Sequence, residues 1–241
     1  MKPEKKCLII TGGEGVPLPE ELRNTLEGSY VIACDSGYKN AQNAGITPDL
    51  IIGDFDSAPL PDTKIPLRQY PTRKDDTDTM LAARHALELG YGDITIACGL
   101  GGRMDHAFAN IQTGAFIVSS GGRARMIGKD TELYFFGRAL ERQEEREDAS
   151  PDHGADEALQ KEILRIPCHK GYSLSVFSLS DRSEGVTIRG TKYEVTGASI
   201  TNTYPIGASN VWSSSDTGAE ISVRSGILLV ILSRLTPGEH I

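Results

Sequence analysis

Two aspartates placed two residues apart follow a short apolar segment and form the clearest candidate for metal chemistry. Residues 50–53 are apolar or glycine, and Asp54 and Asp56 follow that segment with one residue between them. In an extended chain this spacing projects both carboxylates to the same side. Like charges this close repel unless a cation neutralises them, and Mg²⁺ prefers carboxylate and phosphate oxygens. The same residues also suit a polar turn, and by themselves they favour neither interpretation.

A second acidic group stands before a helical pattern. Lys74, Asp75, Asp76, Thr77 and Asp78 precede an apolar stripe with helical spacing. Helix capping and the helix dipole explain one or two acids at such a position. Three acids and a lysine exceed that requirement, which favours metal and phosphate binding. We therefore expect Lys74, Asp75, Thr77 and Asp78 to belong to a metal and phosphate site.

A glycine-rich run with an arginine is the third candidate. The sequence GLGGRMDH begins at Gly99 and lies between a predicted strand and a predicted helix. Gly101 and Gly102 let the backbone approach a ligand, and the following helix N-terminus offers amide donors to an anion. Arg103 can bind phosphate through two parallel hydrogen bonds, and Asp105 lies beside it. The run is not an ordinary P-loop, and a flexible turn with a surface arginine is the alternative.

Weaker signals follow two other predicted strands. Asp35 comes directly after residues 30–34, and Gly12 and Gly13 come after residues 7–11, where adenosine phosphates commonly bind. Each is mostly turn chemistry when taken alone. Taken together, the candidates from all four segments are more informative than any one of them. Their acids and arginine all fall at one predicted edge of the sheet: Asp35, Asp54, Asp56, Asp78, Arg103 and Asp105.

The elements that position these residues predict an α/β fold with a Rossmann-like parallel sheet and helices on both faces. The predicted strands are residues 7–11, 30–34, 50–53, 93–98 and 123–127, and the predicted helices are residues 19–26, 38–44, 77–89 and 104–118. Apolar strands separated by helices are typical of a parallel sheet buried on both faces. Ligands collect at the carboxyl ends of such strands.

The second part of the chain predicts a small antiparallel β-sandwich. Residues 138–162 are dominated by charge and indicate an exposed linker with one helical turn around 156–160. From residue 163 the pattern has period two, as in residues 172–179, 185–188 and 219–223. We expect a catalytic domain over 1–137, the linker over 138–162 and the sandwich over 163–241.

Composition excludes several classes of protein. A net charge of −8 argues against non-specific nucleic-acid binding, and no apolar run reaches the length of about 20 residues that spans a bilayer. The apolar segment near the N-terminus is too short for a signal peptide. The 4 cysteines are far apart, without the spacing of a zinc site or disulfide framework. We expect a cytoplasmic protein.

The assembled motifs resemble the thiamine pyrophosphokinase family over nearly the full length. The matching pieces are DSG at Asp35, GDFDS at Gly53, DDTD at Asp75 and GGRMDH at Gly101, with the apolar run from Gly226. The resemblance implies Mg²⁺ held by acids matching Asp54, Asp56 and Asp78, with ATP as co-substrate. It implies active-site roles for the residues matching Asp35, Asp75, Arg103 and Asp105.

The resemblance also covers the second domain. It implies a thiamine-binding sandwich and a homodimer with active sites between subunits, and Ser209 and Asn210 match the element that holds the thiamine pyrimidine. Many family members carry Gly-x-Lys-Trp, whereas this chain has Tyr193 at the aromatic position. Tyrosine keeps a ring face for the thiazolium cation, although tryptophan is the better partner. Trp212 lies close to Asn210 in sequence, and compensation for the missing tryptophan and a core or interface role are both open.

The implied reaction is ATP plus thiamine giving thiamine diphosphate and AMP. Either Asp35 or Asp105 could accept the hydroxyl proton, since crowded carboxylates raise one another's pKa. Three alternatives remain: a haloacid-dehalogenase-like phosphatase using Asp54 and Asp56, a nucleotide-sugar transferase, and a non-catalytic thiamine or nucleotide sensor. The phosphatase class usually has its motif near the chain start, and the transferase leaves the arginine-containing run unexplained.

Overall fold

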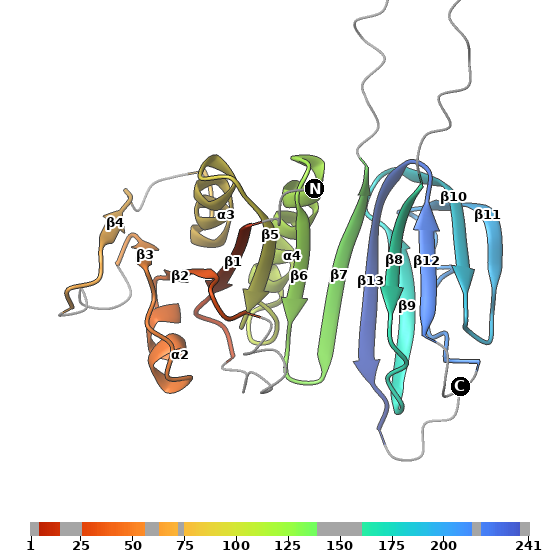
Figure 1. Cartoon of the computed structure of the whole chain (residues 1–241), viewed down its shortest axis with the longest axis horizontal. Helices are drawn as coiled ribbons and strands as arrows, with labels where there is room; N and C mark the ends of the chain where they lie inside the picture. The colour runs from red at the N-terminus through yellow and green to blue at the C-terminus, as the bar shows by residue number, and fades with distance from the viewer. Residues whose placement is uncertain are drawn as a thin grey trace, which may run out of the picture. The chain divides into compact units, whose positions relative to one another are not determined.

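The chain divides into two compact units, Met1–Phe135 and Phe136–Ile241, which are described separately (Figure 1). The structure is a computed structural model that describes residues 5–14, 26–55, 63–71, 75–138, 161–213 and 218–236. The predicted helix over 19–26 lies almost wholly outside these residues, and the predicted turn at 156–160 lies wholly outside them. No helix of the described residues is long and apolar enough to cross a membrane.

The first unit is built on a mixed sheet with the strand order β4-β3-β2-β1-β5-β6-β7. Strands β4 to β6 of this order run parallel, whereas β7 is antiparallel to β6. The strands are β1 (Lys5–Ile10), β2 (Tyr30–Cys34), β3 (Leu50–Gly53), β4 (Leu67–Gln69), β5 (Tyr91–Ala97), β6 (Arg123–Ile127) and β7 (Thr131–Arg138). The five predicted strands are confirmed within two residues at each end.

The strands β4 and β7 were not predicted, for different reasons. All residues of β4 are exposed, so its sequence lacks the apolar pattern of a buried strand. The strand β7 continues from β6 by a tight hairpin and runs to Arg138, where the prediction placed the start of the linker. The prediction of a wholly parallel sheet was therefore too simple at this edge.

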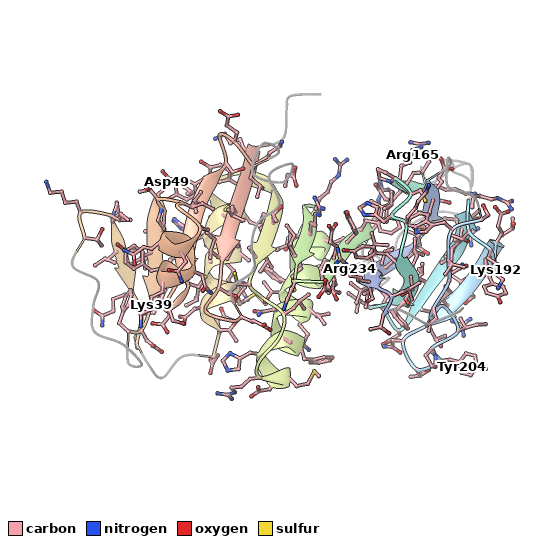
Figure 2. The ribbon with its side chains drawn as sticks, turned by 90° about the horizontal axis from the view of Figure 1, so that it is seen from below. Lys39, Asp49, Arg165, Lys192, Tyr204 and Arg234 are labelled. Atoms are coloured by element: carbon pink, nitrogen blue, oxygen red, sulfur yellow. The ribbon has the colours of Figure 1, made fainter. Side chains whose placement is uncertain are left out.

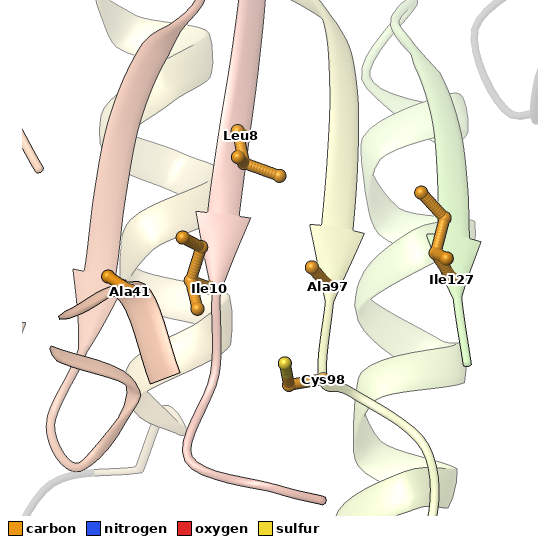
Figure 3. Close-up of a cluster of buried hydrophobic side chains, with 6 residues drawn as sticks. All are labelled: Leu8, Ile10, Ala41, Ala97, Cys98 and Ile127. Atoms are coloured by element: carbon orange, nitrogen blue, oxygen red, sulfur yellow. The ribbon is translucent and has the colours of Figure 1, made fainter. Parts of the chain in front are cut away.

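Helices cover both faces of this sheet, as predicted. They are α2 (Gly37–Asn43), α3 (Asp78–Glu88) and α4 (Met104–Ser119). Ala41 of α2 packs with Leu8, Ile10 and Ile127 on one face (Figure 3). Strand side chains alternate between faces, so Phe135, which pairs with Ala124 across from it, lies on the other face. There the Phe135 ring packs against Gly114 of α4.

The second unit has two antiparallel layers. One contains β9 (Tyr172–Ser178) paired with β13 (Gly226–Arg234), and the other has the order β11-β10-β12-β8. Its strands are β8 (Glu162–Ile166), β10 (Arg182–Arg189), β11 (Val195–Thr201) and β12 (Ala219–Val223). Because β10 contacts β13 and β11 contacts β9, the layers face each other as a small sandwich. The fold class, α/β followed by a β-sandwich, is confirmed.

The helix α2 approaches β1 so closely that Gly37 has no room for a side chain. A Cβ at Gly37 would lie 2.1 Å from the Ile10 carbonyl oxygen, which is backbone and cannot rotate away. Gly37→Ala should therefore lower the free energy of unfolding by about 1–3 kcal/mol, although alanine favours helices. Denaturant unfolding measures this change. Ser36→Ala, which removes a side chain that makes no capping bond, should change it by less than about 0.5 kcal/mol.

Candidate active site

Four loops of the first unit meet around one cavity of about 780 Å³. They follow β1, β2, β3 and β5, whose parallel carboxyl ends lie at the same edge of the sheet, and the N-terminal turns of α3 and α4 complete the lining. The cavity brings together nine of the residues selected from the sequence: Gly12, Gly13, Asp35, Asp54, Thr77, Asp78, Gly101, Gly102 and Arg103.

Other selected residues stand apart from this lining. Asp105 contacts Arg103 but is not among the cavity residues, and Asp75 is exposed just before α3. Asp56 and Lys74 lie outside the described residues. The cavity also contains acids that were not selected from the sequence, Glu14 and Asp76.

Asp35 has an unusual backbone and an unsatisfied carboxylate. Its φ is 45°, in the left-handed region that aspartate tolerates better than most residues. Its amide bonds to the Ile52 carbonyl at 2.7 Å, which ties the end of β2 to β3. Its Oδ1 is buried and makes no hydrogen bond to any described residue. A buried carboxylate oxygen without a partner is costly, so this atom calls for a cation or a ligand donor.

Local chemistry at the start of α3 fixes Asp78. Thr77 caps the helix, accepting from the Met80 amide at 3.2 Å. Cys34 Sγ donates to the Asp78 carbonyl at 3.6 Å, which links the helix start to the end of β2. Asp76 differs from its neighbours because Arg84 pairs with it at 3.0 Å. Capping therefore explains Thr77 and an ion pair explains Asp76, and both residues line the cavity together with Asp78.

The cavity is lined by several carboxylates, which is relevant to whether it binds a metal ion. Its carboxylates are those of Glu14, Asp35, Asp54, Asp76 and Asp78, so a polyphosphate could enter only with cations to offset the repulsion. No group of three or more His, Cys, Asp or Glu side chains in the described residues could hold an ion alone. Mg²⁺ does not require such a group, because it usually takes one or two carboxylates and completes its shell with water and substrate phosphates. The orphaned Asp35 oxygen fits the same ion.

Arg103 and Asp105 form an exposed bidentate pair. Arg103 Nε donates to Asp105 Oδ1 at 3.1 Å, and Nη2 donates to Oδ2 at 2.5 Å. The hydrogen bond from Arg103 lowers the pKa of Asp105 to about 2, aided by the His106 amide. A carboxylate with so low a pKa is a poor base at neutral pH. Asp105 occupies the Nε–Nη2 edge of Arg103, and the remaining N–H groups on Nη1 and Nη2 suit phosphate oxygens.

The loop after β1 has no room for a side chain at Gly13. A Cβ at Gly13 would lie 2.2 Å from the Cys98 carbonyl oxygen, so the loops after β1 and β5 touch through their backbones. Three polar side chains that the sequence did not single out hold these loops: Thr11, Asn40 and Asn110. An asparagine in a helix gives no local signal of such a contact, because its partner is set by tertiary packing.

In the second unit, Asn210 is a buried clamp. Its Oδ1 accepts from the amides of Tyr193 and Val211, both at 3.0 Å. Its Nδ2 donates to Thr191 Oγ1 at 3.0 Å and to the Tyr193 carbonyl at 2.8 Å. All the hydrogen-bonding positions of the amide are thus occupied within the protein. The clamp holds the loop that carries Tyr193.

Tyr193 and Ser209 lie at the surface of this unit. The Tyr193 side chain is 56% exposed, and the neighbouring Lys192 ammonium lies 5.2 Å from its ring centroid. Lys192 and Tyr204 project outward from the unit (Figure 2). Ser209 has a φ of 58°, and its amide donates to Ser175 Oγ at 3.0 Å. The ring of Tyr193 is therefore available to a ligand and already accepts a cation.

Comparison with known proteins identifies the family. One family model, the catalytic domain of thiamin pyrophosphokinase, matches residues 23–121. A second, the vitamin B1 binding domain of thiamin pyrophosphokinase, matches residues 161–228. Together they take in more than half of the chain, which belongs to the thiamin pyrophosphokinase family. This membership confirms the resemblance drawn from the motifs, and the comparisons do not favour the phosphatase or the nucleotide-sugar transferase.

Individual thiamine pyrophosphokinases are similar to this chain in sequence and in fold. Thiamine pyrophosphokinase from Bacillus subtilis is 33% identical over 138 residues, which are 55% of this chain and 64% of that protein. The crystal structure of that thiamine pyrophosphokinase superposes with a TM-score of 0.76 at 25% identity, covering 96% of this chain and 100% of that one. The thiamin pyrophosphokinase from Geobacillus thermodenitrificans superposes with a TM-score of 0.72 at 23% identity, covering 96% and 99%, and supports the fold alone.

Proposed function

We propose that this protein transfers the pyrophosphoryl group of ATP to the hydroxyl of thiamine, producing thiamine diphosphate and AMP. The thiamine oxygen forms a bond to the β-phosphorus, and the bond from that phosphorus to the oxygen shared with the α-phosphate breaks. The observation that carries the proposal is the convergence of acids, Arg103 and glycine-rich loops on one cavity in a chain of this family. Positioning and charge neutralisation are the main requirements of such transfers.

The acids provide for magnesium. In this proposal Asp54, Asp56 and Asp78 would hold Mg²⁺, and Asp54 and Asp78 line the cavity. The ion would neutralise phosphate charge and orient the polyphosphate for in-line displacement. Asp54 follows β3 and Asp78 begins α3, so the two acids share the cavity only when the helix is packed on the sheet.

The remaining groups act on phosphate charge and on the proton. Arg103 binds phosphate oxygens through its fork, while the loops at Gly12, Gly13, Gly101 and Gly102 offer backbone amides. The proton of the thiamine hydroxyl passes to Asp35 rather than to Asp105. Asp35 has a buried oxygen without a partner, whereas the pKa of Asp105 is held at about 2.

The second unit supplies the thiamine site in this proposal. Tyr193 offers its ring to the thiazolium cation, in the position where related proteins have tryptophan, and Ser209 and Asn210 support the pyrimidine end. Because Asn210 is saturated within the protein, its support acts through the Tyr193 loop. Lys192 would have to leave the ring face that the cation takes.

Location and assembly are also part of the proposal. The free thiols of Cys7, Cys34, Cys98 and Cys168 suit the reducing cytoplasm. A homodimer is supported by the apolar side chains of Met104 and Phe108, which are 81% and 59% exposed one turn apart on α4. An exposed apolar pair of this kind suits burial by a second subunit.

Product analysis tests the reaction. The protein is incubated with ATP, Mg²⁺ and thiamine, and nucleotides are separated by chromatography. We expect AMP and thiamine diphosphate in equal amounts, and no AMP when thiamine is omitted. ADP as the product would indicate single phosphoryl transfer. Phosphate release from an aryl phosphate without ATP would favour the phosphatase, and ligand binding without turnover would favour the sensor.

A further inference from the structure

The carbonyl oxygens at the end of β5 are each bonded to a donor of the protein. Ala97 O accepts from the Thr11 amide at 3.0 Å, and Cys98 O accepts from Thr11 Oγ1 at 2.5 Å. Gly99 O accepts from Nδ2 of Asn110, a buried side chain of α4, at 2.9 Å. Cys98 has a φ of 60°, which a non-glycine residue keeps only when its surroundings hold it. These bonds fix the peptide planes of the loop.

Asn40 of α2 holds carbonyl oxygens of the loop after β1 in the same way. Its Nδ2 donates to the Thr11 carbonyl at 2.9 Å and to the Gly13 carbonyl at 3.0 Å. Both acceptors are carbonyl oxygens, so only the nitrogen of the amide can face them. An aspartate of the same shape would set carboxylate oxygens against two carbonyls.

The amides of the same loops have no such partners. The N–H groups of Gly12, Gly13, Gly101 and Gly102 donate to no acceptor in the described part of the chain, and all of these residues line the cavity. Gly101 and Gly102 have φ values of 88° and 66°. Left-handed backbone next to a helix start lets successive N–H groups form a concave site for an anion.

We propose that Asn40 and Asn110 are positioning residues for the phosphate chain of a nucleoside triphosphate. Each holds carbonyl oxygens of a cavity loop on an amide donor, so that the loop presents N–H groups rather than carbonyls to an anion. The identity of the ligand rests on the proposed function, whereas the anion site itself rests on the loops.

Four variants test this inference. Asn40→Asp and Asn110→Asp keep the side-chain shape and lose the donors, and Asn40→Leu and Asn110→Leu do so without adding charge. Each should raise the KM for ATP by at least about tenfold, because it releases loop carbonyl oxygens that were bonded to an amide donor. The KM for thiamine should change by less than about twofold, a split that general unfolding would not produce.

Matched controls lie on the same helices. Asn43→Asp on α2 and Gln112→Glu on α4 make the same amide-to-carboxylate change at exposed positions outside the cavity, and both should leave the KM for ATP unaltered. Asn110→Ser, which keeps a donor of shorter reach, replaces Asn110→Leu if that variant does not fold. Its KM for ATP should fall between those of the wild type and Asn110→Asp.

Calorimetry with inorganic pyrophosphate separates this inference from the proposed function. If the wild type binds pyrophosphate and Asn40→Leu binds it at least about tenfold more weakly, the inference holds even when no AMP is made from thiamine. If both leucine variants bind ATP and pyrophosphate like the wild type, the inference is overturned although the reaction stands. A wild type that binds neither compound overturns it as well.

Discussion

Asp54→Asn is expected to lower kcat by at least about a hundredfold at saturating ATP and thiamine, because the amide is neutral and a weaker ligand for Mg²⁺. Asparagine has the shape of aspartate, so the loop after β3 should remain folded. The Mg²⁺ concentration that gives half-maximal turnover should rise as well. Steady-state kinetics over a series of Mg²⁺ concentrations measures both changes.

The control for this prediction is Asp130→Asn. Asp130 is an exposed acid in the turn between β6 and β7 and does not line the cavity, so its neutralisation should leave kcat within about twofold. Equal losses in both variants would point to net charge as the cause. Near wild-type turnover of Asp54→Asn at saturating Mg²⁺ would show that Asp54 is not a metal ligand.

Arg103→Ala is expected to lower kcat/KM for ATP by at least about tenfold, because the fork that binds phosphate oxygens is lost. Arg103→Lys keeps the charge without the bidentate geometry and should retain part of the activity. The pKa of Asp105, held at about 2 by Arg103, should rise toward its ordinary value in the alanine variant. Steady-state kinetics and NMR titration measure these changes.

A double variant separates two causes of the Arg103 effect. Removing the arginine also leaves the Asp105 carboxylate unpaired beside an anion site. If that carboxylate caused the loss, Arg103→Ala combined with Asp105→Asn would recover activity; we expect no recovery. Arg123→Ala, at the exposed start of β6 and away from the cavity, should behave like the wild type. Wild-type kinetics of Arg103→Ala would remove it from the site.

Local sequence predicted the parts of the fold where one pattern dominates. The apolar strands with residues such as Ile9, Ile51 and Ile96 are buried on both faces, so composition alone indicates them. The exposed strand β4 carried no such pattern. The hairpin strand β7 was not predicted. Charged residues follow Phe136, and this change in composition was taken for the end of the domain.

The candidate site likewise has features that were predictable from the sequence and features that were not. Acids and glycines after strands were visible as motifs, and the parallel order of the sheet made their convergence predictable. The state of each side chain was not predictable. Asp76 is paired with Arg84 and Asp105 with Arg103, whereas Asp35 keeps a buried oxygen without a partner. Similar residues in similar motifs thus differ because their neighbours come from other elements.

By itself the sequence determined the two-part fold, the family and the acids and arginine available for chemistry, because strand burial, turn residues and helix starts are short-range properties. Tertiary structure alone decided which backbone groups remain free for a ligand. Thr11 bonds to the Cys98 carbonyl across a separation of 87 residues, and Asn40 reaches back to the loop after β1. Such contacts depend on how the helices pack on the sheet, which no local pattern of residues records.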